Sequence, residues 1–283
     1  MIDWENLHYF SVFTEEKSLS AAARKLGVDH ATVSRRIAQL EQNLKLKLVD
    51  RRPRTYILTP DGERLAQVVA RMMEETFSIE RLTQAGQQEV MGSVSISMPP
   101  LTAAHLIMLH LGKFYRHYPQ LKLRVLGDVH YVSLQHSEAD IAVRFGRPKD
   151  ENLVARKVGE IPFGIYAGSN YLASTDPENY EWISVEVGGV HGQKQQKLKE
   201  RLNHKEPIMV TNNPELQWRA ACGEIGLAVL PDFLGAISNL VRLQDDYPMS
   251  AEIWLVTHED LRHSPAIRAV MDFLMSCFEP FKV

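Results

Sequence analysis

Cysteine is scarce in this sequence, which has only Cys222 and Cys277 among its 283 residues. Each cysteine stands among apolar residues, so we expect two buried thiols rather than a disulfide. The eleven histidines are scattered along the chain and show no metal-ligand spacing. The sequence therefore predicts no metal site.

Motifs of several enzyme classes are missing as well. No G-x-G-x-x-G segment follows a strand-like stretch, and the P-loop, G-x-S-x-G and H-E-x-x-H motifs do not occur. Gly188–Gly192 is rich in glycine, but without a nucleophile motif it supports no catalytic mechanism. We therefore expect that the protein is not an enzyme and uses no cofactor.

Long apolar runs are also absent. No stretch approaches the roughly 20 apolar residues that cross a bilayer. The N-terminus carries Asp3 and Glu5 and lacks the basic and apolar regions of a signal peptide. The length predicts about two domains, and hydrophobic residues make up 45% of the chain. We expect a globular, cytoplasmic protein with no membrane partner.

Positive charge is concentrated in one segment. Residues 17–60 contain ten Lys and Arg side chains and three acidic ones, a net charge of +7, whereas the whole chain carries −3. A local basic patch of this kind is typical of proteins that bind nucleic acid.

Residues 18–37 have the pattern of a helix-turn-helix. A serine followed by alanines predicts a short helix, Gly27 permits a tight turn, and Asp29 is a candidate N-cap of a longer helix. Apolar residues recur on one side of the longer helix, which leaves its other side free to contact a major groove. An ordinary helical hairpin with a solvated face has the same spacing. The candidate DNA contacts are Ser18, Ser20, His30, Ala31, Thr32, Ser34, Arg35 and Arg36.

A second basic element follows between two short apolar stretches, Leu48-Val49 and Tyr56-Ile57-Leu58. Pro53 and the arginines around it predict a β-turn that forms a wing against the phosphate backbone or in the minor groove. A solvated basic loop is the alternative. The candidate DNA contacts of the wing are Arg51, Arg52 and Arg54.

These segments resemble the LysR-type transcriptional regulators. The resemblance rests on Leu7 and Phe10 in an opening helix, on Ser-Leu-Ser-x-Ala-Ala at 18–23, on Val-Ser-Arg-x-Ile at 33–37, and on Leu-Thr-Pro-x-Gly at 58–62. It implies an N-terminal winged helix-turn-helix, all-α with a small β wing, then a long linker helix and a C-terminal effector domain. It also implies a homo-oligomer, a dimer or a tetramer, that reads an inverted repeat in double-stranded DNA.

The sequence departs from the usual pattern of that family at two places. Leu44-Lys45 stands where the family usually has Leu-Gly, and Leu48-Val49-Asp50-Arg51 stands where it has Leu-Phe-x-Arg. Both departures concern packing and a turn, and they leave the DNA-facing residues unchanged.

Thr59 and Pro60 predict the start of a long helix that continues to about Gly86. Its apolar residues keep near heptad spacing and its opposite face is polar. The resemblance implies that this helix pairs with a second subunit, and packing on its own domain is the alternative. We divide this half of the chain into a DNA-binding domain at 1–59 and a linker helix at 60–89.

Strands and helices alternate from residue 90 onward, which predicts parallel-sheet α/β architecture. The resemblance implies that residues 90–283 form a two-lobed α/β domain similar to periplasmic binding proteins. We expect one helix over Leu101–Tyr118, a short helical stretch near His130–His136 and a last helix over Ser264–Phe278. The chain then crosses between the lobes near Ile161–Gly164 and Val256–Glu259, so that lobe I covers about 90–161 and 258–283, and lobe II about 162–257.

Open α/β sheets bind ligands at the carboxyl ends of their strands, so we expect a small-molecule effector in the cleft between the lobes. Thr102 lies at a helix start suited to a carboxylate, although the same segment is compatible with a cap that binds nothing. Arg144 favours an anionic effector, and a pair with Asp140 or another acid is equally compatible with the sequence. The candidate effector contacts are Pro100, Leu101, Thr102, Val129, His130, Arg144, Phe145, His191, Thr211 and Asn212.

Two functions fit these observations. One is a transcription regulator whose DNA binding is controlled by an effector between the two lobes. The other is an architectural DNA-binding protein whose C-terminal body serves only oligomerisation. A change in the DNA footprint or bend upon effector binding separates the first function from the second.

Overall fold

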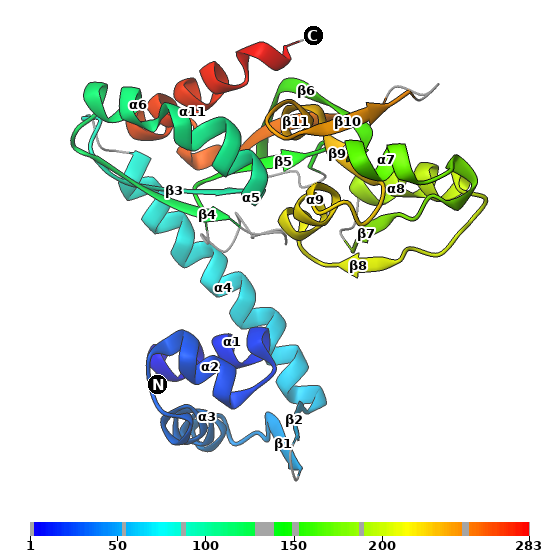
Figure 1. The fold of residues 1–283 in the computed structure, drawn as a ribbon. Helices are drawn as coiled ribbons and strands as arrows, with labels where there is room; N and C mark the ends of the chain where they lie inside the picture. The colour runs from blue at the N-terminus through cyan, green and yellow to red at the C-terminus, as the bar shows by residue number, and fades with distance from the viewer. Residues whose placement is uncertain are drawn as a thin grey trace. The chain divides into compact units, whose positions relative to one another are not determined.

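The computed structural model describes residues 3–52, 55–85, 89–127, 139–148, 153–186, 190–244 and 249–282. The chain divides into two compact units, Met1–Arg81 and Leu82–Val283, and Figure 1 shows the helices and strands of both. The helical stretch expected near residues 130–136 lies outside the described residues.

The first unit contains three short helices, a β-hairpin and most of a long helix. The hairpin strands are antiparallel, with Val49 opposite Leu58 and Arg52 opposite Thr55. This unit is the predicted winged helix-turn-helix with most of the linker helix. Its elements are α1 (Trp4–Glu16), α2 (Leu19–Leu26), α3 (His30–Leu44), β1 (Val49–Arg52), β2 (Thr55–Leu58) and α4 (Pro60–Ala85).

Local hydrogen bonds set the ends of these helices as the sequence predicts. The Ser18 hydroxyl accepts from an amide in the first turn of α2, and the Asp29 carboxylate accepts from the Thr32 amide at 2.7 Å. Gly27 ends α2 with φ of 68°, a conformation that is unstrained because glycine has no Cβ. The Thr59 hydroxyl accepts from an amide in the first turn of α4. These caps fix where α3 and α4 begin, and they involve only residues a few positions apart.

The core of the first unit lies among α1, α2, α3 and the base of the hairpin. Phe10, Phe13 and Leu40 are fully buried there, and α4 adds Val69 from one face. Ile79, further along α4, is 65% exposed. The apolar stripe of α4 is therefore divided: one edge packs on the first unit, and the other edge is exposed in the single chain, at Val68, Met72 and Ile79.

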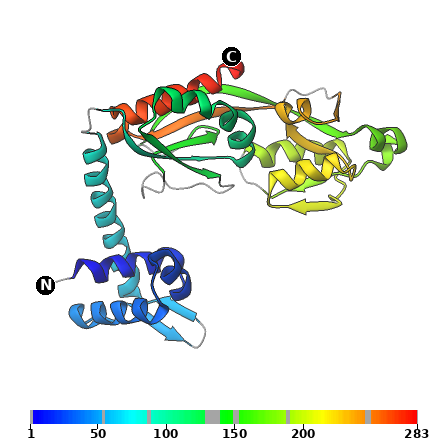
Figure 2. The same ribbon diagram turned by 60° about the vertical axis from the view of Figure 1, so that its left-hand side comes forward.

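Lobe I of the second unit is a sheet with helices on one face. α6 and α11 lie side by side over that face, and the rings of Phe114 and Phe273 join them with centroids 4.8 Å apart (Figure 1 and Figure 2). The elements of this lobe are β3 (Gly92–Met98), α5 (Pro100–Thr102), η1 (Ala103–Ile107), η2 (Met108–His110), α6 (Leu111–His117), β4 (Leu121–Gly127), β5 (Ile141–Phe145), the first half of β6 (Leu153–Gly168), β11 (Met249–His258), η4 (Glu259–Leu261), α11 (Pro265–Cys277) and η5 (Glu279–Phe281).

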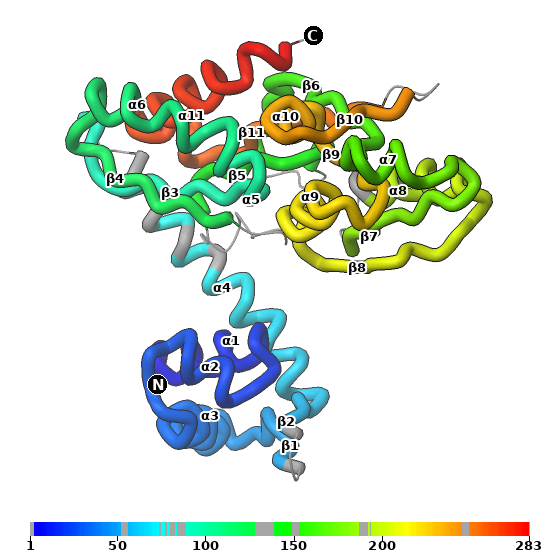
Figure 3. The backbone as a smooth tube through the Cα atoms, in the orientation of Figure 1, coloured from blue at the N-terminus to red at the C-terminus, as the bar shows by residue number. Residues whose placement is uncertain are grey.

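The chain passes into lobe II along β6, whose path can be followed in Figure 3. Phe163 pairs with Met249 of β11 and with Pro231 of β9, so this residue marks the change of partner along β6. The elements of lobe II are α7 (Ser169–Ser174), η3 (Pro177–Asn179), β7 (Ile183–Val185), α8 (Val190–Arg201), β8 (Met209–Thr211), α9 (Pro214–Cys222), β9 (Ala228–Pro231), α10 (Asp232–Ala236) and β10 (Leu240–Leu243).

The return to lobe I occurs earlier than the sequence indicates. β11 pairs with β6 from Met249 and with β5 from Ile253, so the strand is already part of lobe I before Val256–Glu259. The apolar residues of β11 continue from the part paired with β6 alone into the part paired with both β6 and β5. Hydrophobicity alone therefore does not mark where the chain crosses between the lobes.

The main sheet is mixed, which corrects the expected parallel architecture. Its strand order is β10-β6-β11-β5-β3-β4, with β9 also paired to β6. β3 runs parallel to β4 and β5, and β7 runs parallel to β8, whereas β11 is antiparallel to β5 and β6. The antiparallel pairs arise because β6 and β11 carry the chain between the lobes in opposite directions.

The expected helix over Leu101–Tyr118 is interrupted. It consists of the short α5, a π-helical turn at Ala103–Ile107, a 3-10 turn and then α6. π-helical turns occur often at functional sites. The last helix, α11, follows the expected bounds closely.

One of the two expected buried thiols is exposed. Cys277 is buried in the core of lobe I, but Cys222 is the last residue of α9 and faces solvent. The expectation of burial was wrong for Cys222 because apolar neighbours in sequence do not show on which side of a helix end a residue lies. No helix among the described residues is long and apolar enough to cross a membrane.

Candidate DNA interface and effector cleft

The N-terminal turns of α3 present the face predicted to contact DNA. His30, Ala31 and Arg35 are exposed, and Thr32 and Ser34 are half-buried. Their exposure follows from the periodicity of α3, because Val33, Ile37 and Leu40 on its other side are buried. Ser18 and Ser20, at the start of α2, are also exposed.

Two of these side chains are also used to cap their helices. The Thr32 hydroxyl donates to the Asp29 carboxylate at 3.1 Å, and the Thr32 amide donates to the same group. These bonds lower the pKa of Asp29, the amide bond being the larger cause. The Ser18 hydroxyl accepts from the Ala21 amide at 3.5 Å.

Arg36 lies against α1, unlike Arg35 beside it. Its guanidinium is 2.7 Å from the Glu5 carboxylate and 5.5 Å from the centroid of the Tyr9 ring. The sequence predicts the same role for Arg35 and Arg36 because both are basic and lie on the polar side of the helix near its N-terminus. Neighbouring residues on a helix point about 100° apart, and in this case one faces solvent and the other faces α1.

The base of the wing is held by a buried carboxylate. Glu41 is 5% exposed, and its Oε1 accepts from the backbone amides of Leu48 and Val49 at 2.9 and 3.2 Å. Its Oε2 lies 3.5 Å from the Arg51 guanidinium and 3.7 Å from Lys47 Nζ. α3 and β1 are thereby joined, and the Arg51 side chain of β1 reaches the carboxylate on α3.

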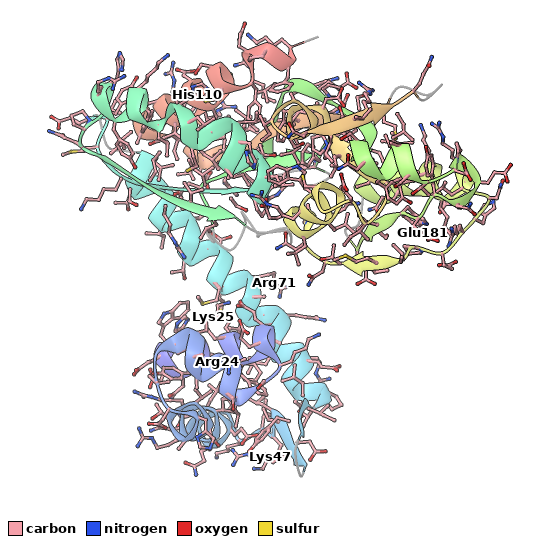
Figure 4. All side chains as sticks on the ribbon, in the orientation of Figure 1. Arg24, Lys25, Lys47, Arg71, His110 and Glu181 are labelled. Carbon is pink, nitrogen blue, oxygen red and sulfur yellow. The ribbon has the colours of Figure 1, made fainter. Side chains whose placement is uncertain are left out.

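The remaining wing arginines are described only in part. The backbone of Arg52 lies in β1, its side chain is outside the described residues, and Arg54 lies outside them altogether. Figure 4 labels Lys47 beside the wing and Arg24 and Lys25 on α2. Lys25 is paired with Glu15 at 2.8 Å, and the hydrogen bond to that carboxylate raises the pKa of the ammonium.

In the second unit a pocket opens between lobe I and lobe II. Its empty volume is about 420 Å³, part of which is open to solvent. Thr102 and Gln217 are its polar side chains, and the other residues that line it are apolar. The lining residues are Pro99, Pro100, Leu101, Thr102, Phe145, Pro214, Gln217, Val229, Leu230, Pro231 and Phe233.

The pocket brings together part of the predicted effector set. Pro100, Leu101, Thr102 and Phe145 line it. Thr211 and Asn212 do not, although Pro214, two residues after Asn212, does. Val129 and His130 lie outside the described residues, as does the His191 side chain.

Arg144, predicted to meet an anionic effector, is not among the residues that line the pocket. It is buried, and its guanidinium donates to the Ser97 hydroxyl from two nitrogens, at 3.1 and 3.2 Å. Asp140, its predicted alternative partner, instead accepts from the amide and the hydroxyl of Ser95, both at 2.7 Å. Arg144 therefore joins β5 to β3 within lobe I.

The lobe II side of the pocket was missed by the sequence prediction. It comes from the first turn of α9 and from the end of β9. A signal was present, because Asn213 with Pro214 is a helix start and Pro231 stops a buried strand. Gln217 is also structural, since its side-chain amide donates to the Ile183 carbonyl at 2.9 Å. No cluster of His, Cys, Asp and Glu fit to hold a metal occurs within the described ranges.

Two family descriptions match the chain. Residues 4–63 match the bacterial regulatory helix-turn-helix protein, lysR family, and residues 87–278 match the LysR substrate binding domain. The second match alone covers more than half of the chain.

Known proteins with similar sequences include regulators of transcription. HvrB of Rhodobacter capsulatus, an AhcY transcriptional activator, is 33% identical over 177 residues, which are 60% of this chain and 60% of HvrB. PtxR of Pseudomonas aeruginosa, an HTH-type transcriptional regulator, is 26% identical over 298 residues, covering 100% of this chain and 96% of PtxR.

Solved structures show the same fold. The full-length Vibrio cholerae virulence activator AphB, a member of the LTTR protein family, has a TM-score of 0.64 at 21% identity and covers 97% of this chain and 99% of its own. CrgA of Neisseria meningitidis, a LysR-type transcriptional regulator, has a TM-score of 0.57 at 23% identity. The match covers 99% of this chain and 100% of the CrgA chain.

Proposed function

The chain belongs to the LysR family of transcriptional regulators, and on that premise we propose that it binds an inverted-repeat operator as a homo-oligomer under the control of a small-molecule effector. The DNA-binding part of this proposal rests on the exposed N-terminal face of α3. His30, Ala31 and Arg35 lie on this face, and the buried apolar residues of α3 lie on the opposite side. Side chains in that position reach base edges when the helix enters a major groove.

Self-association is supported by the divided stripe of α4. Val68, Met72 and Ile79 are exposed in the single chain, on a helix whose other edge is already packed. A second copy of α4 buries these side chains in a coiled-coil contact. Two linked recognition helices bind two half-sites with much greater affinity than one, and their spacing selects the inverted repeat.

We divide the chain into a DNA-binding domain at 1–59, a linker helix at 60–89 and an effector domain at 90–283. The helix-turn-helix contacts come from Ser18, Ser20, His30, Ala31, Thr32, Ser34 and Arg35, and the wing contacts from Arg51, Arg52 and Arg54. Arg36 has a positioning role, because its ion pair with Glu5 holds α1 against α3. The protein acts in the cytoplasm, where its DNA is.

The effector half rests on the pocket between the lobes. Residues of α5 and β5 face residues of α9 and β9 across it, so a ligand that contacts both sides favours one angle between the lobes over others. A preference of about 1–3 kcal/mol between two arrangements is the usual size of an allosteric coupling. The coupling changes the spacing of the winged helices on the operator.

Selection from random double-stranded DNA tests the DNA-binding half. We expect the full-length protein to enrich two half-sites related by inverted symmetry, with centres one DNA turn or a multiple of it apart. Enrichment of single, unpaired sites would contradict the proposal that a homo-oligomer binds both half-sites of the operator.

Footprinting on the enriched site tests the effector half. Size-fractionated small molecules from a cell extract are added to the complex, with the same fractions after dialysis as the control. We expect one fraction to change the footprint or the bend. If no fraction changes either of them, the C-terminal domain serves assembly alone.

A further inference from the structure

Three aromatic rings join the two lobes next to the pocket. The ring of His105 in lobe I has its centroid 5.2 Å from that of Trp218 on α9 and 6.3 Å from that of Phe233 on α10. The planes of the imidazole and the indole are nearly perpendicular, at 85°. Phe233 lines the pocket, and Trp218 directly follows the lining residue Gln217. His105 therefore contacts two helices of lobe II, both labelled in Figure 1.

The backbone that carries His105 is irregular. The residue lies in the middle of the π-helical turn Ala103–Ile107, which interrupts the helix expected over Leu101–Tyr118. Such turns are rare and often occur at functional sites. The contact between the lobes thus lies at the point where lobe I departs from regular helical geometry.

Trp218 buries a hydrogen-bond donor that has no acceptor. The residue is 5% exposed, and its indole Nε1 is buried without a hydrogen-bond partner among the residues that the structure describes. A buried donor without an acceptor destabilises the arrangement that contains it. An arrangement of the lobes that supplies an acceptor therefore gains stability.

His105 carries the acceptor that this donor lacks. The guanidinium of Arg219 lies 4.2 Å from the centroid of the Trp218 ring, but it can only donate, and it is paired with Glu215 at 2.9 Å. The Phe233 ring has no nitrogen or oxygen. A neutral imidazole has one nitrogen that accepts. Because His105 and Trp218 belong to different lobes, a change in the angle between the lobes moves this nitrogen relative to the indole N–H.

We propose that His105 and Trp218 form a latch between the lobes. The imidazole accepts from the indole N–H when the lobes close over the pocket, and the ligand-free protein exchanges between this closed arrangement and the one in which the N–H has no acceptor. A ligand in the pocket contacts Phe233, whose ring packs on His105, so it acts next to the latch. The proposal rests on the proposed effector cleft and names the residue pair that sets the balance between its two arrangements.

The first test follows the indole proton of Trp218 in the full-length protein without any ligand. The protein has four tryptophans, so the indole nitrogens are labelled with ¹⁵N and the Trp218 signal is identified by its loss in Trp218→Phe. His105→Phe keeps a ring and removes the acceptor, whereas His105→Gln keeps an acceptor. His110→Phe is the matched control, since His110 is an exposed histidine in the same segment. Circular dichroism verifies that each variant is folded.

We expect the indole proton of Trp218 to exchange with solvent faster in His105→Phe. The expected increase is about two- to tenfold, the change in an equilibrium constant that corresponds to the net contribution of one hydrogen bond. His105→Gln retains most of the protection, and His110→Phe exchanges as the unaltered protein does.

The second test asks whether the bond controls the response on DNA. The cell-extract fraction that changes the operator footprint is added in serial dilutions to each variant. Closure is less favourable without the bond, so His105→Phe needs about two- to tenfold more of the fraction for the same change. Trp218→Phe removes the donor and shows the same shift, and the double variant shows no further shift because both substitutions remove one bond.

The proposal is overturned if the indole proton exchanges equally fast in His105→Phe and in the unaltered protein, or if His110→Phe accelerates it as much. It is also overturned if an active fraction acts on His105→Phe at the same dilution as on the unaltered protein, because the bond is then purely structural. If exchange accelerates as expected and no fraction changes the footprint of the unaltered protein, the latch stands and the effector role of the pocket is wrong.

Discussion

Arg36 of the recognition helix forms an ion pair with Glu5 of the first helix, with 2.7 Å between Nη2 and Oε1. The pair turns one of two adjacent arginines toward the first helix and leaves Arg35 exposed. Sequence neighbours with the same chemistry therefore have different surroundings, and their substitution has different consequences.

Arg36→Ala is expected to affect the domain more than its choice of DNA. Glu5 is half-exposed and screened by solvent, so the free energy of unfolding falls by about 1 kcal/mol or less. Urea unfolding measures this loss, and Glu5→Gln is the matched control that breaks the same pair from the other side. A loss of operator affinity in Arg36→Ala as large as that in Arg35→Ala would contradict the positioning role.

Arg35→Ala and Arg52→Ala are expected to weaken DNA binding in different ways. Loss of a base contact costs about 1–3 kcal/mol on the operator and relaxes the choice of sequence, so Arg35→Ala loses more affinity for the operator than for random DNA. Arg52→Ala loses a phosphate contact and weakens both equally, with a smaller dependence on salt. Fluorescence anisotropy with operator and random duplexes at several salt concentrations separates the two; equal losses for both variants on both duplexes would refute the assignment.

Glu41→Ala is expected to destabilise the wing. Two buried amides, those of Leu48 and Val49, lose their acceptor, and each unsatisfied buried group costs about 1–3 kcal/mol. Hydrogen exchange of these two amides, followed by NMR, should become faster, while exchange in the second unit stays unchanged. Lys47→Ala is a suitable control, since it removes only an exposed partner of Glu41; similar protection in all three proteins would argue against the role of Glu41.

Ile79→Glu is expected to weaken self-association. The side chain is 65% exposed in the single chain, and a carboxylate at a coiled-coil seam leaves a charge buried between two subunits. Light scattering coupled to size exclusion should report a smaller assembly at the same protein concentration. Gln67→Glu adds the same charge to an exposed position on another face of α4 and should leave the assembly unchanged. Assemblies of equal size for Ile79→Glu and the unaltered protein would place the contact elsewhere.

The two thiols are expected to react at very different rates. Cys222 is exposed, whereas burial raises the pKa of Cys277 to about 11, so the reactive thiolate of Cys277 is nearly absent near neutral pH. Iodoacetamide labelling followed by peptide mass spectrometry should find Cys222 modified and Cys277 protected, and both modified in urea. Because the folded state holds the proton of Cys277 more tightly than the unfolded chain, its contribution to stability is present below the unfolded pKa and is lost as the pH rises toward 11. Early labelling of Cys277 in the native protein would show that its surroundings open readily.

The caps of the DNA-binding domain were predictable because they depend on residues a few positions apart. The Asp29 carboxylate accepts from the Thr32 amide three residues later and caps α3. The Thr59 hydroxyl accepts from the Gly62 amide, also three residues later, and caps α4. The burial of Val33 and Ile37 follows from helical periodicity in the same way.

The cleft was predictable only on one side. Thr102 and Phe145 stand at the ends of strands that the sequence marks clearly, and both line the pocket. Gln217 and Phe233 lie on helices whose orientation depends on how lobe II packs, and no short-range pattern indicates which of their residues face lobe I. Cys222 was misjudged for the same reason.

The sequence by itself determined the winged helix-turn-helix, its basic charge, the linker helix and the alternation that makes the second unit α/β. These features depend on spacing, caps and turn residues, which act over a few positions of the chain. Tertiary structure alone decided that Arg36 turns toward Glu5 and that Arg144 is bound to Ser97. It also decided that the ammonium of Lys194 on α8 packs over the Phe163 ring of β6. These side-chain partners depend on which strands and helices pack against each other. That packing is determined jointly by residues far apart in the chain.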